Sequence, residues 1–151
     1  MKYSTWILIA FFALGCNQNV EQQAKASQPQ TLTAAAEAEA SAGVIDIPVD
    51  QAQDMIKTQS GKPDFIIVDV RTPREYAAGH LPGAQLMNLF DPDFQQKLQQ
   101  LDRDKTYLVY CRSGNRSGQA ISIMEKLGFK NVYHMYQGFM TWEAKGLPVE
   151  K

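Results

Sequence analysis

The chain has 151 residues, which is enough for one compact domain and an additional segment. Its 15 basic and 16 acidic side chains give a formal net charge of −1, so composition gives no reason to expect nucleic-acid binding. The two histidines and two cysteines do not form a cluster at metal-ligand spacing, and we expect neither a metal nor a cofactor.

Residues 1–16 have the composition of an export signal. A short positive region, Met1-Lys2, precedes a continuous apolar run from Trp6 to Leu14. That run is shorter than the roughly 20 apolar residues that cross a bilayer. It ends at Ala13-Leu14-Gly15-Cys16, which resembles the lipobox of bacterial lipoproteins, although such boxes usually carry Leu in place of Ala13.

The lipobox resemblance implies that Cys16 is lipidated and becomes the mature N-terminus. Ordinary cleavage and an uncleaved anchor remain alternatives. A lipidated protein would be exported and held by its acyl chains on the periplasmic side of a bacterial membrane. Asn17 after the cysteine resembles outer-membrane sorting in Gram-negative cells.

Residues 17–43 are predicted to be a disordered tether, because they are rich in Gln, Ala, Ser and Glu and poor in large apolar residues. As a coil, the segment would span about 30 Å. If Cys16 carries lipid, Cys111 has no cysteine left to pair with in an oxidising compartment, which favours a reactive thiol.

Residues 44–151 are predicted to form one α/β domain, in which strand-length apolar runs alternate with helical patterns. Strands are predicted at 44–47, 65–68, 84–89, 107–110 and 132–135. Helices are predicted from 49 to before Gly61, after Thr72, from Asp91 to about 100, at 117–127 and at 138–145. Thr72-Pro73-Arg74-Glu75 has the pattern of a helix start with a capping box.

This alternation predicts a central, mainly parallel five-stranded sheet with helices on both faces. Sites in such sheets form at the carboxyl ends of strands. Cys111 directly follows the strand at 107–110 and begins a loop that leads into a helix. Loop amides and the helix dipole favour a thiolate at that position, so we expect the chemistry there.

The surroundings of Cys111 are predicted to be positively charged. No acidic residue lies between Asp104 and Glu125, whereas Lys105, Arg112 and Arg116 all fall in that window. A positive patch of this kind would attract small anions.

Three motifs in this order resemble those of the rhodanese domain. They are Asp69 to Ala84, the loop Cys111-Arg112-Ser113-Gly114-Asn115-Arg116-Ser117, and the element Gly138-Phe139-Met140-Thr141-Trp142. The resemblance covers residues 44–148. It implies a three-layer rhodanese-like fold and a sulfurtransferase that works as a monomer.

The resemblance also implies the chemistry. Cys111 would attack the sulfane sulfur of thiosulfate, hold it as a persulfide, and pass it to cyanide or a thiol. Arg112 and Arg116 would pair with thiosulfate or sulfite oxygens. The substrate-binding residues are expected to be Arg112, Ser113, Gly114, Asn115, Arg116 and Ser117. For Ser117, helix capping is an alternative role.

The sequence supports other functions less well than sulfur transfer. Related phosphatases and arsenate reductases carry an arginine six positions after the cysteine, whereas Arg116 lies five after Cys111 and Ser117 occupies the sixth position. The shorter loop fits a sulfur atom better than a phosphate. A persulfide carrier that receives sulfur from a protein partner remains the main alternative, and an inactive interaction domain is disfavoured by the intact Cys111 loop.

Several polar residues near these motifs are predicted to be structural. Asp69 and Arg71 are expected to form an ion pair that braces the site. His80 is expected to fix a turn by hydrogen bonding, and Glu75 to cap a helix. We assign no functional role to His134.

Overall fold

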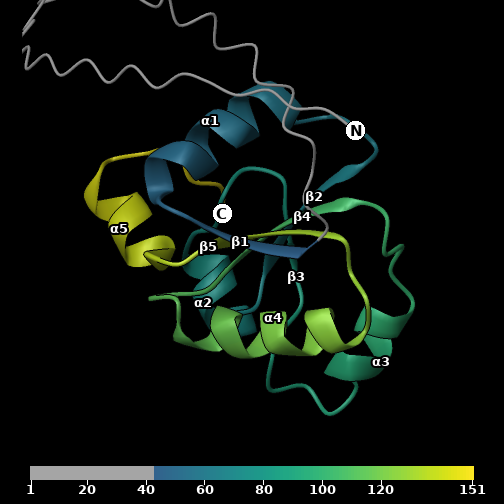
Figure 1. Cartoon of the computed structure of the whole chain (residues 1–151). Coiled ribbons are helices and arrows are strands. Elements are labelled where there is room, and N and C mark those ends of the chain that lie inside the picture. The colour runs from purple at the N-terminus through teal and green to yellow at the C-terminus, as the bar shows by residue number, and fades with distance from the viewer. Residues whose placement is uncertain (1–42) are drawn as a thin grey trace, which may run out of the picture. The chain divides into compact units, whose positions relative to one another are not determined.

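The computed structural model describes residues 43–151. In this part of the chain, five strands form one sheet in the order β1-β5-β4-β2-β3, and every neighbouring pair is parallel (Figure 1). The strands are β1 Gly43–Ile47, β2 Phe65–Asp69, β3 Ala84–Leu86, β4 Thr106–Tyr110 and β5 Asn131–Met135. The helices are α1 Val49–Gln59, α2 Pro73–Ala78, α3 Phe94–Gln99, α4 Asn115–Lys126 and α5 Gly138–Ala144.

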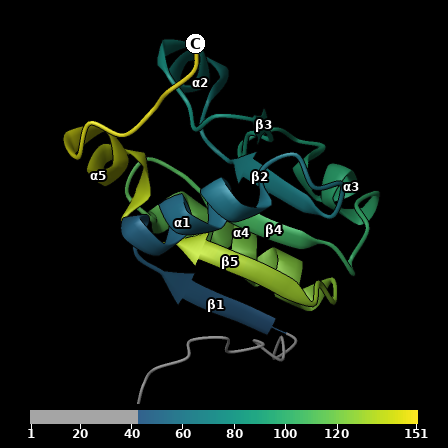
Figure 2. The ribbon, with the colours of Figure 1, turned by 90° about the horizontal axis from the view of Figure 1, so that it is seen from above.

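Helices cover both faces of the sheet (Figures 1 and 2), and the hydrophobic core forms two clusters. Figure 1 shows α1 and α4 on opposite sides of the sheet. Because side chains alternate along a strand, Leu108 and Tyr110 of β4 join one cluster, while Tyr107 and Val109 join the other. The first cluster includes residues of α1 and α5, and the second includes residues of α3 and α4. The predicted three-layer α/β architecture is therefore confirmed.

The predicted capping box at the start of α2 is also present. The Thr72 hydroxyl accepts a hydrogen bond from the Glu75 amide at 3.4 Å, and the Glu75 carboxylate accepts one from the Thr72 amide at 3.1 Å. Pro73 occupies the first helical position, where its missing N–H costs nothing. This cap fixes the direction in which α2 leaves the end of β2.

Three predicted boundaries were wrong by two or more residues. The strand predicted at 84–89 ends at Leu86. The helix predicted from Asp91 begins at Phe94, because residues 91–94 form a turn in which the Phe94 amide donates to the Asp91 carbonyl. The helix predicted from Ser117 begins at Asn115, because Gly114 has a left-handed φ of 90° and leads the chain into α4 two residues earlier.

No helix within residues 43–151 has the length and apolar character needed to cross a membrane. The predicted signal peptide at 1–16, the lipidated Cys16 and the tether at 17–43 lie outside the described residues, except that Gly43 is the first residue of β1.

Candidate active site

The Cys111 loop lies between the end of β4 and the start of α4, and the first turn of α5 holds it from one side. The Phe139 amide donates to the Cys111 carbonyl at 2.8 Å, and the Met140 amide donates to the Arg112 carbonyl at 3.0 Å. These two donors would otherwise be unpaired at the N-terminus of α5. The cysteine side chain itself is buried, with 1% of the residue exposed.

Two glycines make this close approach possible. Gly114 has φ 90°, and a Cβ at this position would collide with the Tyr136 carbonyl oxygen. Gly138 has φ 69°, and a Cβ there would collide with the Arg112 carbonyl oxygen. The loop and the β5–α5 turn are therefore in backbone-to-backbone contact, which no larger residue allows at these two positions.

Hydrogen bonds at the sulfur favour the thiolate. Burial by itself raises the pKa of the Cys111 thiol. The Ser117 hydroxyl, 3.4 Å from Sγ, and the backbone amides of Ser117, Ser113 and Gly114 outweigh burial, and the pKa lies below its ordinary value. The amides that converge at the start of α4 therefore stabilise a negative charge on Sγ without a metal.

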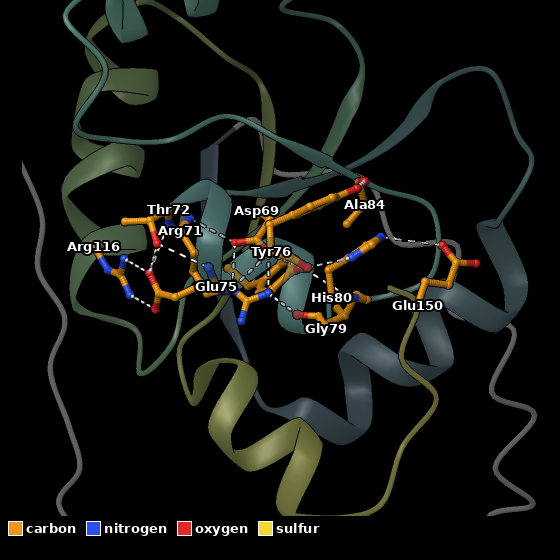
Figure 3. Close-up of polar contacts among 12 residues, drawn as sticks. Asp69, Arg71, Thr72, Glu75, Tyr76, Gly79, His80, Ala84, Arg116 and Glu150 are labelled. Carbon is orange, nitrogen blue, oxygen red and sulfur yellow. Dashed lines mark hydrogen bonds and ion pairs between the residues drawn. The ribbon is translucent and has the colours of Figure 1, made fainter.

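The predicted substrate-binding residues differ in their availability. Arg112, Ser113 and Asn115 are exposed, and Arg112 lines a pocket of about 140 Å³, which has room for several waters or a small anion. Arg116 instead makes a two-pronged ion pair with Glu75, with both N–O distances at 2.7 Å (Figure 3). Because Glu75 already pairs with this guanidinium, the structure does not test whether Arg116 binds an incoming anion, and that role stays a prediction.

Glu75 does more than the predicted capping. Its hydrogen bond with Arg116 is the largest influence on the carboxyl and lowers its pKa from 4.5 to about 2, with further help from Thr72. The same pair raises the pKa of Arg116. Glu75 thus joins α2 to the first turn of α4, next to the Cys111 loop.

Acidic side chains from other parts of the chain lie beside the positive charges predicted around Cys111. Glu75 of α2 and Glu143 of α5 line the same pocket as Arg112, and they add negative charge from elements distant in sequence. Arg71 also lines this pocket, with its charge paired to the Asp69 carboxylate.

Asp69 and Arg71 form the expected ion pair at the end of β2, with 2.7 Å between Arg71 Nη2 and Asp69 Oδ2 (Figure 3). Both residues are almost fully buried. The Tyr110 hydroxyl donates to the same carboxylate at 2.7 Å, and burial together with Asp69 raises the pKa of Tyr110 far above its usual value. Arg71 also donates to the Gly79 carbonyl and lies 4.0 Å from the Phe139 ring centre.

His80 holds the turn after α2. Its Nδ1 lies 3.0 Å from the Tyr76 carbonyl oxygen, and its ring stacks on that of Tyr76 with 3.7 Å between centroids (Figure 3). Its backbone pairs with that of Glu150 near the C-terminus. These contacts are structural ones.

Ser117 is not a helix cap, since the residue at the N-cap of α4 is Gly114. Its hydroxyl contacts the Cys111 sulfur and lies 2.9 Å from Nε2 of His134. Nδ1 of His134 in turn lies 2.7 Å from Asp46. Sequence reasoning missed His134 and Asp46. Strand alternation could have indicated the position of His134. His134 follows Val132 by two residues, so its side chain lies on the same face of the sheet as that of Val132, toward α4.

Within residues 43–151, no group of three or more His, Cys, Asp or Glu side chains could hold a metal ion.

The family comparison matches the Rhodanese-like domain over residues 49–145. The thiosulfate sulfurtransferase GlpE of Pseudomonas putida is 37% identical over 99 residues, which cover 65% of this chain and 84% of that protein. A sulfurtransferase of Allochromatium vinosum is 36% identical over 87 residues, covering 57% of this chain and 78% of that protein.

Solved structures agree with the fold. A rhodanese-like domain protein from Staphylococcus aureus matches with a TM-score of 0.56 and 26% identity, over 72% of this chain and 99% of that one. A rhodanese-like domain from Anabaena matches with a TM-score of 0.57 and 27% identity, over 70% of this chain and 76% of that one.

The contact at Gly114 predicts a large stability cost for Gly114→Ala. The added methyl group would meet the Tyr136 carbonyl at a left-handed φ, and we expect the free energy of unfolding to fall by on the order of 3–5 kcal/mol. Gly128→Ala is the matched control, because Gly128 has φ 82° but open space around it, and should cost about 1–2 kcal/mol. If urea denaturation gave the same loss of unfolding free energy for both variants, the contact between Gly114 and the Tyr136 carbonyl would contribute nothing to stability.

The Glu75–Arg116 pair predicts a pH dependence of stability. Because the folded-state pKa of Glu75 is lowered from 4.5 to about 2, the contribution is complete above pH 4.5 and is lost as the pH falls towards 2. Partial exposure of both side chains to water limits this stabilisation to about 1 kcal/mol. Glu75→Gln should remove this part of the fall in unfolding free energy, whereas Glu143→Gln should retain it. If the unfolding free energy of Glu75→Gln fell with pH as it does in the wild type, the Glu75–Arg116 pair would not be the source of this pH dependence.

Proposed function

Because this chain belongs to the Rhodanese-like domain family, we propose that it moves a sulfane sulfur from thiosulfate, or a similar small donor, to a thiophilic acceptor. The observation that carries the proposal is the lowered pKa of the buried Cys111 thiol. Its sulfur is buried, yet the Ser117 hydroxyl and three backbone amides lower the pKa of the thiol. A thiolate is the form of cysteine that attacks sulfur.

Two displacements would complete the reaction. The Cys111 thiolate attacks the outer sulfur of thiosulfate, the S–S bond to the sulfite group breaks, and sulfite leaves with the bonding electron pair. The persulfide anion that remains carries the same charge as the thiolate, so the same amides can stabilise it. An acceptor thiolate or cyanide then takes the outer sulfur and restores the Cys111 thiolate, which makes ping-pong kinetics the expected pattern.

The arginines would have different roles in this reaction. Arg112 is exposed and lines the pocket, so its guanidinium is available to thiosulfate or sulfite oxygens. Arg116 is held by Glu75, and we place it as a positioning residue that fixes the first turn of α4. Ser113 and Gly114 would act through their backbone amides.

A persulfide carrier would use the same cysteine but take its sulfur from a protein donor. The donor that loads Cys111 therefore separates the two functions. Thiosulfate is the donor named for the GlpE relatives, which supports the small-molecule reaction.

The N-terminal sequence supports a proposed location for this activity. Lipidation at Cys16 would hold the domain at the periplasmic face of a bacterial membrane, the outer membrane in a Gram-negative cell, with residues 17–43 as its tether. The domain would act there as a monomer on small anionic donors.

Thiosulfate is expected to add one sulfur atom to the folded domain, detected by intact-protein mass spectrometry, and Cys111→Ser should abolish the gain. Arg112→Ala should lower kcat/KM for thiosulfate about tenfold through loss of one charge-assisted contact. Arg74→Ala, which removes an exposed arginine of α2 outside the pocket lining, is the control. A gain of sulfur only from a persulfidated protein would establish the carrier function instead.

Cys16→Ala is expected to release the full-length protein from the membrane fraction, because the acyl chains supply the anchoring energy. Immunoblotting of fractionated cells that express the wild-type and variant chains would measure this. Retention of the variant in the membrane fraction would show that the apolar run from Trp6 to Leu14 anchors the protein by itself.

A further inference from the structure

A continuous chain of polar contacts connects the buried Cys111 sulfur to an exposed carboxylate. The Ser117 hydroxyl lies 3.4 Å from Cys111 Sγ and 2.9 Å from His134 Nε2, and His134 Nδ1 lies 2.7 Å from Asp46 Oδ1. Ser117 is fully buried, 9% of His134 is exposed, and 69% of the Asp46 side chain is exposed. The contacts therefore run from the interior to the solvent.

The sheet topology brings these residues together from three elements. Asp46 of β1 and His134 of β5 are direct partners in the parallel register. Val132, two residues before His134, is packed in the cluster that contains residues of α4, so His134 faces the same side. Ser117 lies in the first turn of α4, and the imidazole packs beside Gly118, where a Cβ would lie 4.0 Å from His134 Cε1.

We propose that Ser117, His134 and Asp46 form a proton relay that takes up the thiol proton of Cys111 when the nucleophile forms. This inference rests on the proposed role of Cys111 as the nucleophile. Cys111 is the catalytic residue, and the three others act through it as positioning and proton-transfer residues. Burial leaves Cys111 little direct exchange with water, so its proton needs a path of this kind.

The proton balance closes along this chain. In the resting thiol, S–H points to Ser117 Oγ, the Ser117 hydroxyl donates to Nε2, and Nδ1–H donates to Asp46. Transfer of the thiol proton to Oγ and of the hydroxyl proton to Nε2 gives a thiolate and an imidazolium. Ser117 then donates to the thiolate, Nε2–H donates to Ser117, and Nδ1–H still donates to the Asp46 carboxylate. No oxidant or further reactant is required.

The tautomer is set by the carboxylate, because Asp46 accepts a hydrogen bond from Nδ1–H and leaves Nε2 unprotonated and facing the serine. The other charged groups near the sulfur are Arg116 of α4 and its partner Glu75 of α2, together with Arg112 in the loop. The Gly114 carbonyl, 3.0 Å from Ser117 Oγ, is a competing acceptor for the hydroxyl proton. It also lies 3.3 Å from Nε2, so the Nε2–H of the imidazolium would be shared between Ser117 Oγ and this carbonyl, which weakens the competition for the Ser117 hydroxyl proton.

The test is the pH dependence of Cys111 alkylation by iodoacetamide, which needs no sulfur donor. His134→Gln is expected to lower the rate at about pH 6.5 by roughly tenfold, equivalent to one pKa unit at the sulfur. Asp46→Asn should move the profile in the same direction by about threefold, since the amide still accepts from Nδ1 but carries no charge. Adding His134→Gln to Ser117→Ala should cause no further loss, because both substitutions interrupt one path.

His80→Gln is the matched control, because it removes the other histidine of the chain, whose ring bonds to Tyr76, and should leave the alkylation profile as in the wild type. Thermal denaturation of each variant separates loss of folding from loss of the relay, and Asp46→Asn changes an exposed side chain if His134→Gln does not fold. Wild-type profiles in both Asp46→Asn and a folded His134→Gln would overturn the relay. A shifted profile in protein that never gains sulfur from any donor would leave the relay standing and overturn the proposed sulfur transfer.

Discussion

The site depends on the close fit between two backbone segments, the Cys111 loop and the turn between β5 and α5. Gly114 approaches the Tyr136 carbonyl, Gly138 approaches the Arg112 carbonyl, and the first amides of α5 donate to carbonyls of the loop. With its carbonyls occupied in this way, the loop can direct the Ser113, Gly114 and Ser117 amides at the sulfur. A buried thiol with a lowered pKa follows from that arrangement, because fixed donors outweigh the cost of burying the charge.

A frame of ion pairs stabilises the surroundings of this loop. The buried Asp69–Arg71 pair, with the Tyr110 hydroxyl, joins the ends of the neighbouring strands β2 and β4. The Glu75–Arg116 pair joins α2 to the start of α4. Removing one member of the buried Asp69–Arg71 pair would leave the other charge without compensation, which is strongly destabilising. Arg112 of the loop is exposed and lines the pocket.

Local patterns in the sequence predicted the elements well and their boundaries less well. The apolar runs at Phe65–Val68 and Tyr107–Tyr110 correspond to β2 and β4, and Thr72 with Glu75 forms the capping box. The start of α4 was misplaced because a left-handed Gly114 is not visible in hydrophobic periodicity. The third strand was predicted to be too long. Apolar residues continue beyond Leu86, but β3 pairs with β2 over three residues only.

The sequence by itself determined the α/β class, the position of Cys111 after a strand and before a helix, and the resemblance to the rhodanese family. These properties depend on residues that are neighbours along the chain. Only the tertiary structure decided which charges meet: Glu75 engages Arg116 across 41 positions, and Asp46 reaches His134 across 88. The physical reason is that electrostatic and hydrogen-bond energies depend on distance in space, which the order and register of the parallel strands set.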